Sequence, residues 1–389
     1  MKNILFIQFD YPPILAPESI QTQRRAISLA NMGHRITVIT GHNGPKYEYL
    51  DDTLLETHEN INIIKTKQPY FESSLNIACK LIGIDRKLWW YFYAIESAMK
   101  IIESNSIDIV YSHSNSIVNH FVGLFLKVKY KKNIKWISHF SDPWSLNPYV
   151  NYNFVVKKMI HRYFENKILK NCDKLIVTSK KTKELFINEF SYLEEKTYIL
   201  PHTFDQRLYT LSKKDTDNQN KIVVHTGNIY GLRTIKYFLE ALKEYKPKNI
   251  EFHFYGKIKD SELNLVNKFG LEDVVKIYSQ IPYLDSLNVI SSADFLMVID
   301  AQLLKSPFFP SKLADYIGAK KPIIALTPLD SASVDILNHI KNNKYIASSE
   351  NKEDIKKIFK NLEIEDGEYV NIDFYNMNNF DLLKDIFEK

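Results

Sequence analysis

Short apolar runs alternate with helical patterns along most of the chain. Runs such as 4–9 and 109–112 are apolar at nearly every position, whereas segments such as 19–32 repeat apolar residues at helical spacing. Strands that are apolar on both faces and joined by helices are typical of a parallel sheet covered on both sides. In the first half we predict strands at 4–9, 36–40, 109–112, 136–138 and 175–178, and helices at 19–32, 89–103 and 152–171.

The same rhythm restarts after a polar stretch at 212–221, whose composition suits an exposed linker. The strands predicted there are 222–226, 250–255, 274–277, 295–299 and 322–325, and the helices are 234–244, 261–269, 283–291, 311–317 and 331–340. We therefore predict an α/β fold of two Rossmann-like, doubly wound parallel-sheet domains facing a cleft. Their expected bounds are 1–205 and 206–368, with a helical tail at 369–389 that packs back on the first domain.

Composition narrows the class of protein. A hydrophobic content of 45% excludes disorder as the main state, and a net charge of +5 over 389 residues is too mild to imply a nucleic-acid binder. Such a charge suits a phosphate-bearing substrate or an anionic membrane surface. Cys79 and Cys172 are too few for a disulfide framework or a cysteine-rich metal site, which fits a reducing cytoplasm. The first apolar run is too short for a signal peptide, and no run spans a bilayer, so any membrane contact is expected to be peripheral.

The segment from Pro310 onward carries a candidate anion site. Pro310 predicts a helix start, Ser311 can cap free backbone N–H groups, and these groups together with Lys312 could hold a diphosphate. Asp315 lies about one turn further and can accept hydrogen bonds from two ribose hydroxyls. An ordinary capped surface helix is the alternative.

Glycine turns follow two of the predicted strands in the second half. Gly227 ends the strand 222–226 and Gly256 ends the strand 250–255, and both let the backbone approach a phosphate closely. Arg233 stands near the start of the next helix, where it can neutralise a departing diphosphate. If the glycine turns and Arg233 did not lie near the helix that starts at Pro310, the two glycines would be ordinary turns between strand and helix.

In the first half, the loops after the predicted strands offer polar groups that could hold sugar hydroxyls. A proline-bearing loop at 10–17 leads into a helix with Arg24, and the loops 111–116 and 139–145 follow two further strands. The candidates in these loops are Pro13, Arg24, His113, His139 and Asp142. A structural role for each remains open, and Trp144 is expected to pack rather than to stack on a sugar.

The order of these motifs resembles the family-4 retaining glycosyltransferases of the GT-B fold, of the kind that builds bacterial surface polysaccharides. The resemblance covers nearly the whole chain. It is carried in the first half by Tyr11-Pro12-Pro13, 108–113, Asp142-Pro143-Trp144, Cys172-Asp173 with Ser179, and 199–202. In the second half it is carried by Gly227 with Arg233, Gly256, Ile281-Pro282-Tyr283, Ala293-Asp294, 310–316 and Pro322.

The resemblance implies transfer of a sugar from a nucleotide-diphosphate donor to a glycan or lipid-linked acceptor, with retention, without a metal and without a cofactor beyond the donor. It also implies a cytoplasmic enzyme, with the inner face of the cell membrane as a second location, in capsule or O-antigen synthesis. The donor side would comprise Gly227, Asn228, Arg233, Gly256, Ile281, Ser311, Lys312 and Asp315, and the acceptor side Pro13, Arg24, His113, His139 and Asp142. The catalytic set would be Arg233, Lys312, Asp142, His113 and His139.

Two positions depart from the family pattern. Asn228 stands where an arginine is common, while Arg233 occupies the usual lysine position. Pro307 stands where the first of two glutamates grips the donor sugar, and Asp315 matches the second. We expect backbone N–H groups near Phe308 to make the sugar contacts instead.

Three alternatives stay open at this point. The chain could be a sugar-nucleotide epimerase or hydrolase, or a non-catalytic nucleotide-sugar-binding subunit. The basic segment 127–135 with Trp136, together with the aromatic run 89–93, could dock on an anionic membrane, or could be a solvated loop and an aromatic core helix.

Overall fold

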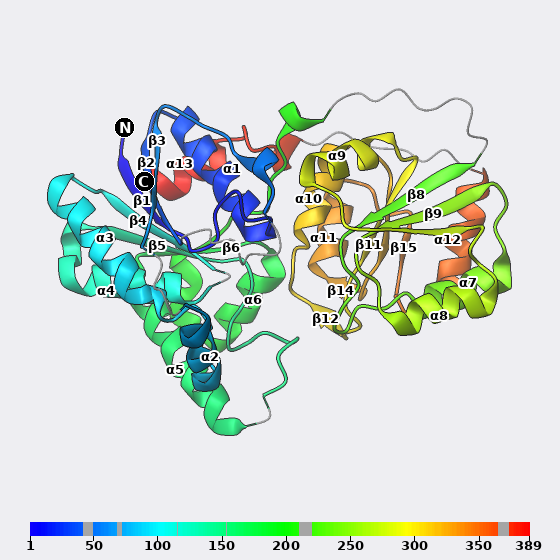
Figure 1. Cartoon of the computed structure of the whole chain (residues 1–389), viewed down its shortest axis with the longest axis horizontal. Coiled ribbons are helices and arrows are strands. Elements are labelled where there is room, and N and C mark those ends of the chain that lie inside the picture. Colours follow the sequence, from blue (N-terminus) through cyan, green and yellow to red (C-terminus); the bar gives the residue numbers. More distant parts are fainter. Residues whose placement is uncertain (42–49, 68–71, 115, 153, 210–219, 365–372) are drawn as a thin grey trace. The chain divides into compact units, whose positions relative to one another are not determined.

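The computed structural model describes residues 1–41, 50–67, 72–114, 116–152, 154–209, 220–364 and 373–389. Within these segments the chain divides into two compact units, coloured along the sequence in Figure 1. Unit 1 comprises Met1–His202 with Met377–Lys389, and unit 2 comprises Thr203–Asn376. Apart from its last two residues, the linker expected at 212–221 lies outside the described residues.

Unit 1 is built on a seven-stranded parallel sheet in the order β3-β2-β1-β4-β5-β6-β7. Its strands are β1 (Asn3–Ile7), β2 (Arg35–Thr40), β3 (Ile61–Lys65), β4 (Ile109–His113), β5 (Lys135–Phe140), β6 (Lys174–Val177) and β7 (Thr197–Ile199). Its helices are α1 (Pro17–Asn31), α2 (Glu72–Ile82), α3 (Trp90–Ser104), α4 (Val118–Tyr130), α5 (Val155–Asn171), α6 (Lys180–Glu189) and α13 (Asp381–Phe387).

Unit 2 repeats the plan with a six-stranded parallel sheet in the order β10-β9-β8-β11-β13-β15 and a two-stranded ladder, β12-β14. Its strands are β8 (Lys221–Thr226), β9 (Ile250–Tyr255), β10 (Val275–Tyr278), β11 (Phe295–Ile299), β12 (Lys305–Ser306), β13 (Ile323–Leu326), β14 (Asp330–Ser331) and β15 (Ile346–Ala347). Its helices are α7 (Lys236–Tyr245), α8 (Asp260–Phe269), α9 (Tyr283–Ser292), α10 (Ser311–Gly318), α11 (Ala332–His339) and α12 (Lys352–Ile364). The α/β prediction of two doubly wound parallel sheets is confirmed.

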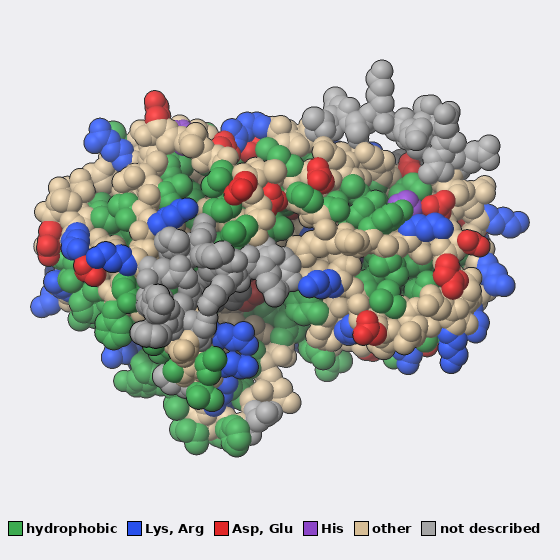
Figure 2. Space-filling view, in the orientation of Figure 1, with side chains coloured by type: hydrophobic (Ala, Val, Ile, Leu, Met, Phe, Trp, Pro, Cys, Tyr) green, Lys and Arg blue, Asp and Glu red, His purple; other side chains and the backbone are tan. Residues whose placement is uncertain are grey.

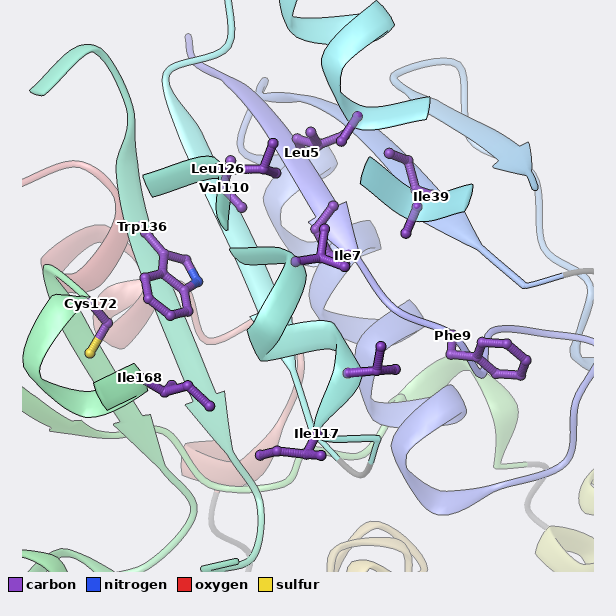
Figure 3. Packing of buried hydrophobic residues seen from close by; sticks show 14 of the residues in the cluster. Leu5, Ile7, Phe9, Ile39, Val110, Ile117, Leu126, Trp136, Ile168 and Cys172 are labelled. Atoms are coloured by element: carbon purple, nitrogen blue, oxygen red, sulfur yellow. The ribbon is translucent and has the colours of Figure 1, made fainter. Parts of the chain in front are cut away.

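The core of unit 1 fills both faces of its sheet. One cluster packs α3, α4, α5 and α6 on the sheet, and Figure 3 shows Trp136, Leu126 and Cys172 within it. The indole Nε1 of Trp136 donates to Ser112 Oγ at 2.9 Å, which satisfies its polar atom inside the core. Cys172 is buried and free, as the two-cysteine composition suggested.

The last helix belongs to unit 1. Leu383, Ile386 and Phe387 of α13 are buried in the cluster on the other face of the sheet, beside α1. Lys2 Nζ donates to the carbonyl of Phe387 at 2.8 Å, and Lys174 Nζ donates to that of Ile386 at 2.8 Å. The segment after residue 376 therefore covers part of a sheet whose first strand lies near the start of the chain.

Of the two interpretations of the aromatic run 89–93 with Trp136, the structure favours the aromatic core helix, although Phe92 is 74% exposed. Trp136 and Trp90 are fully buried and Trp89 is 7% exposed, so their rings lie in the core and do not face a lipid surface. The lysines that precede Trp136 do not form a loop alone, because Lys127 and Lys129 lie on the last turn of α4. In the described segments, the helices are all too short or too polar to cross a bilayer.

A close contact inside this core gives a stability test. A Cβ at Gly123, in α4, would lie 2.4 Å from Nε1 of Trp136. Gly→Ala within a helix is usually stabilising, but here we expect Gly123→Ala to lower the free energy of unfolding by about 1–3 kcal/mol, because the close-packed core cannot accept the methyl group. Urea denaturation measures the change. In the Trp136→Phe background, which lacks the crowding Nε1, the cost of Gly123→Ala should shrink, and equal costs in both backgrounds would contradict the packing argument.

Candidate functional site

Unit 2 brings its two glycine turns together at the carboxyl end of its sheet. Gly227 follows β8 with φ +108° and Gly256 follows β9 with φ +142°, backbone conformations that favour glycine. A Cβ on Gly256 would lie 2.7 Å from the carbonyl carbon and oxygen of Gly227, and a Cβ on Gly227 would lie 2.7 Å from Lys312 Nζ. Gly256 therefore needs glycine for space as well as for conformation, whereas at Gly227 the flexible Lys312 side chain could move and the positive φ is what favours glycine.

The ammonium of Lys312 lies over the Gly227 turn, next to the neutral ring of His225. Lys312 Nζ is 3.4 Å from Nε2 of His225, whose Nδ1 lies 2.8 Å from the carbonyl oxygen of Met297. That carbonyl can only accept, so Nδ1 carries the proton and Nε2 presents a lone pair to Lys312. Burial, and then Lys312, hold the pKa of His225 well below its ordinary value. Burial, followed by Arg233, lowers the pKa of Lys312 to about 7.

Arg233 is held at the end of the same loop. Its backbone N–H donates to Tyr230 O at 3.0 Å, its carbonyl accepts from Lys259 Nζ at 2.6 Å, and its backbone forms an isolated bridge to Ala301. The guanidinium lies 5.1 Å from the centre of the Tyr230 ring. Arg233 thus joins the group around Lys312 through backbone contacts to two neighbouring loops.

Asp300, which the sequence analysis missed, lies beneath these cations. It is fully buried at the end of β11, and its Oδ2 accepts from Thr327 Oγ1 and Ser333 Oγ, each at 2.9 Å. Its Oδ1 is buried with no hydrogen-bond partner among the described residues. Burial raises the pKa of the Asp300 carboxyl, while Ser333, Arg233, Thr327 and Lys312 act to lower it. An acid directly after a run of buried strand residues is the signal that could have found it.

Helix α10 presents Lys312 and Asp315 one turn apart. The hydroxyl of Tyr283 donates to Asp315 Oδ1 at 2.9 Å, and that of Tyr209 donates to the Asp315 carbonyl at 3.0 Å. Tyr316, the next residue, accepts from the backbone N–H of Thr226 at 2.9 Å, which ties the helix to the end of β8. These bonds fix the Asp315 carboxylate near the glycine turn.

The expected cap on this helix is wrong. Pro310 occupies the N-cap position and Ser311 is the first helical residue, so Ser311 does not cap the helix and the N-cap residue has no side chain able to do so. The first turn of α10 thus receives no side-chain bond from its N-cap residue.

The remaining donor-side candidates differ in their placement. Asn228 Oδ1 accepts from the backbone N–H of Lys257 at 2.8 Å, so the residue at the family's arginine position joins the two glycine loops. Ile281 lies two residues before α9 and is half-buried. Pro307, at the family's glutamate position, is buried between the ladder strand β12 and α10.

In unit 1, the two predicted histidines are buried beneath the loops. His113 and His139 are 1% and 2% exposed and their rings stack at 4.2 Å. His113 lies between Thr22 Oγ1 at 2.5 Å and Ser141 Oγ at 2.7 Å, and His139 Nδ1 lies 2.5 Å from Tyr111 OH. Burial holds the pKa of both histidines well below the ordinary value, and neighbouring histidines add to the effect. Both rings are therefore neutral at pH 7.

A pocket of about 220 Å³ lies at the ends of β4 and β5. Asp142 and Trp144 line it, although Trp144 was expected only to pack. The two histidines do not line it, and His113 reaches its wall only through Ser141. The ring of Trp144 also packs on His161 with 4.6 Å between centres, so it serves both packing and the pocket wall.

Glu18, in the first turn of α1, is the pocket residue that the sequence analysis missed. Burial, and then the neighbouring Asp142, raise the pKa of Glu18 to about 7. The sequence signal for Glu18 was an acidic residue at the point where the proline-bearing loop 10–17 meets a helix. Such a loop lies at the carboxyl edge of a parallel sheet, where ligands bind.

Two acceptor-side candidates are buried away from the pocket. Pro13 follows Pro12 through a cis peptide bond, and Arg24 is 3% exposed. Neither is among the residues that line the pocket. Within the described segments, no group of three or more His, Cys, Asp or Glu side chains could hold a metal ion.

Comparison with known proteins agrees with this architecture. The fold is that of the GT-B glycosyltransferases. Residues 21–207 match the model of Glycosyltransferase Family 4, which spans most of unit 1. No curated protein sequence shows a significant match.

Solved structures match over the whole chain at low identity. Sucrose-phosphate synthase from Thermosynechococcus elongatus is 13% identical, with a TM-score of 0.71 over 100% of this chain and 95% of that one. Anabaena HepE, solved with UDP and glucose, is 15% identical, with a TM-score of 0.65 over 100% and 98%. A Listeria monocytogenes protein described as a putative UDP-N-acetylglucosamine 2-epimerase is 13% identical, with a TM-score of 0.61 over 99% and 96%. These likenesses establish the fold.

The raised pKa of Glu18 makes the stability of unit 1 depend on pH. A carboxyl whose pKa is higher in the folded state stabilises the fold below its unfolded pKa, and that contribution is lost as the pH rises from 4.5 to about 7. We expect Glu18→Gln to gain on the order of 2 kcal/mol relative to the parent protein between pH 4.5 and pH 8. Urea titrations at both pH values measure this. Asp142→Asn should give a smaller gain of the same sign, and parallel pH profiles for parent and Glu18→Gln would contradict the assignment.

Proposed function

We propose that this protein is a glycosyltransferase that transfers a sugar from a nucleotide-diphosphate donor to a glycan or lipid-linked acceptor, with retention of configuration. The observation that carries the proposal is the gathering of Lys312, Arg233 and the Gly227 turn at the start of α10 in unit 2. The family match over residues 21–207 supports the same class of activity.

The donor diphosphate is best placed between Lys312 and Arg233. The absence of a Cβ at Gly227 lets phosphate oxygens approach the backbone and the Lys312 ammonium together. Two cations facing one buried carboxylate, Asp300, leave an excess of positive charge that a bound diphosphate would neutralise. Because Anabaena HepE was solved with UDP and glucose, we propose a uridine diphosphate sugar as the first donor to test.

Asp315 is positioned for the ribose and the loop before α10 for the sugar. Two tyrosine hydroxyls fix Asp315, so its carboxylate can accept from ribose hydroxyls without first becoming ordered. Pro307 offers no carboxylate to the donor sugar, and we propose that backbone N–H groups of Phe308 and Phe309 make those contacts.

In the proposed reaction, the bond between the anomeric carbon and the diphosphate oxygen breaks first, leaving an oxocarbenium-like centre. The acceptor hydroxyl then bonds to that carbon on the same face, and its proton passes to the departing diphosphate. Lys312 and Arg233 stabilise the negative charge that develops on the leaving group, which is the task a metal would otherwise perform. The pocket of Glu18 and Asp142 would hold the acceptor, with His113 positioning its wall through Ser141 and His139 stacked on His113.

Two other functions each have one observation in their favour. The likeness to a putative UDP-N-acetylglucosamine 2-epimerase favours an enzyme that acts on the donor alone. Asn228 and Pro307, at positions where the family has charged residues, favour a non-catalytic binding subunit. Product analysis separates the three: a glycoside supports transfer, free or isomerised sugar supports the first alternative, and donor binding without turnover supports the second.

We further propose a role in surface-polysaccharide assembly, at the cytoplasmic face of the cell membrane. The basic net charge and the lipid-linked acceptors of such pathways are what support this location.

The leaving-group assignment predicts large losses on removing either cation. We expect Lys312→Ala and Arg233→Ala each to lower kcat/KM by about 10²-fold or more, because each removes charge stabilisation at the leaving group. Asp315→Asn should act mainly on the KM for the donor. Steady-state transfer assays measure these effects, with Lys248→Ala and Arg35→Ala, which remove exposed cations elsewhere, as charge-matched controls. Wild-type turnover in both site variants would overturn the assignment.

Donor binding should be linked to proton uptake. Lys312, with a pKa of about 7, is largely neutral at pH 8 in the free protein, and a bound diphosphate would raise that pKa and draw in a proton. Calorimetric titration with UDP at pH 8, in two buffers of different ionisation enthalpy, should give an uptake of about 0.5–1 proton. Lys312→Arg, whose side chain is always charged, should bind UDP without uptake. An equal uptake in that variant would place the titrating group elsewhere.

A further inference from the structure

Unit 1 carries an apolar face on the outside of α5 and α2. On α5, Val155, Val156, Met159 and Ile160 are 75%, 66%, 64% and 42% exposed, and on α2, Ile77 and Leu81 are 63% and 83% exposed. We call these six side chains the α2–α5 surface. We propose that the α2–α5 surface docks unit 1 on a lipid bilayer that contains anionic phospholipid.

The spacing on α5 shows that this exposure is a continuous stripe. Positions 155, 156, 159, 160 and 163 fall on one side of a helix, and the last is Tyr163, 61% exposed. The buried residues of α5, which include His161 and Glu165, lie on the opposite side. A surface helix normally turns polar residues outward, so α5 has an apolar face in excess of what its own core requires.

The end of α2 is held against α5 on the side of α5 that carries His161. His161 Nε2 donates to the carbonyl of Gly83, directly after α2, at 2.8 Å, and a Cβ on Gly83 would lie 3.1 Å from Lys157 Nζ. Figure 1 shows the two helices at the same end of unit 1, and Figure 2 shows hydrophobic and basic side chains gathered there.

Charge selects the occupant of this surface. The exposed charged residues of α5 are all basic, whereas its single acid, Glu165, is fully buried and accepts from the backbone N–H of Trp144. The basic residues are Lys157, Lys158, Arg162, Lys167 and Lys170, and Lys80 adds another on α2. A second copy of the chain would bring like charges together across this surface. An anionic bilayer would accept both the apolar stripe and the lysines.

The surface also leads to the pocket of Glu18 and Asp142. Val150, 44% exposed, lines the pocket a few residues before α5 begins, and Trp144 in the pocket wall packs on His161 of α5. An acceptor anchored in the bilayer by a lipid could thus present its polar end to the pocket. This role rests on the proposed function, whereas the docking itself does not.

Vesicle sedimentation of the full chain tests the proposal. We compare phosphatidylcholine vesicles with vesicles that contain 30% phosphatidylglycerol, at 50 mM and 500 mM NaCl. The parent protein should partition at least tenfold more strongly to the anionic vesicles, and high salt should reduce that partition at least threefold. Val155→Gln/Met159→Gln should lower the partition at least fivefold, because glutamine keeps the helix while removing apolar surface. Leu329→Gln/Ile364→Gln, which removes similarly exposed side chains from unit 2, should bind like the parent.

The outcomes are separable from the proposed function. Thermal stabilisation by UDP, read on every variant, shows that the variants are folded and reports on unit 2 independently of lipid. Failure of the parent to bind anionic vesicles, or equal partition of Val155→Gln/Met159→Gln and the parent, would overturn the docking proposal even if UDP binds. A parent dimer in sedimentation velocity that Val155→Gln/Met159→Gln converts to a monomer would also overturn it, in favour of a second copy.

Discussion

Buried charges of both signs meet at the carboxyl end of the sheet of unit 2, and their pairing is incomplete within the described residues. Lys312 and Arg233 act on each other as like charges in a site where burial already disfavours the charged form of Lys312. Asp300 offsets part of this cost, and two hydroxyls hold one of its oxygens while the other is left without a partner. Removing charges from water is costly unless each one is paired. A diphosphate would complete this pairing. The unfavourable interaction of Lys312 with Arg233 would then favour binding of the anion.

The buried histidines near the pocket of unit 1 differ from the charged groups of unit 2. His113 and His139 are neutral, stacked on each other and hydrogen-bonded, so they can hold a wall in place without carrying charge. The acidic group that borders the pocket, Glu18, sits near the pH at which it exchanges its proton. The two sheets share a plan, and the side chains at their carboxyl edges give one a cationic site and the other an acidic pocket.

The central strands were predictable because parallel strands are buried on both faces and read as unbroken apolar runs, such as 109–112. The outer strands β3 and β7 were not predicted, because β3 consists of half-buried and exposed residues and β7 has only three residues. Helix α4 was not predicted, because the lysines of its last turn suggest a solvated loop when only the sequence is considered. The two glycine turns were predicted because glycine directly follows a strand in both places, and Lys312 because it follows a helix-start signal. The structure places them close together, and their role in binding stays a prediction. Asp300 and Glu18 were not identified, because their importance lies in burial and in neighbours distant in sequence, as with Asp300 and Ser333.

The discontinuous make-up of unit 1 has a consequence for how the protein is made. Leu383, Ile386 and Phe387 fill part of its core, yet they follow the whole of unit 2 in the chain. During translation, one face of the sheet of unit 1 therefore stays partly uncovered until unit 2 and then α13 have been synthesised. Closing the first core late, after its neighbour is complete, leaves a period in which chaperones have an apolar surface to bind.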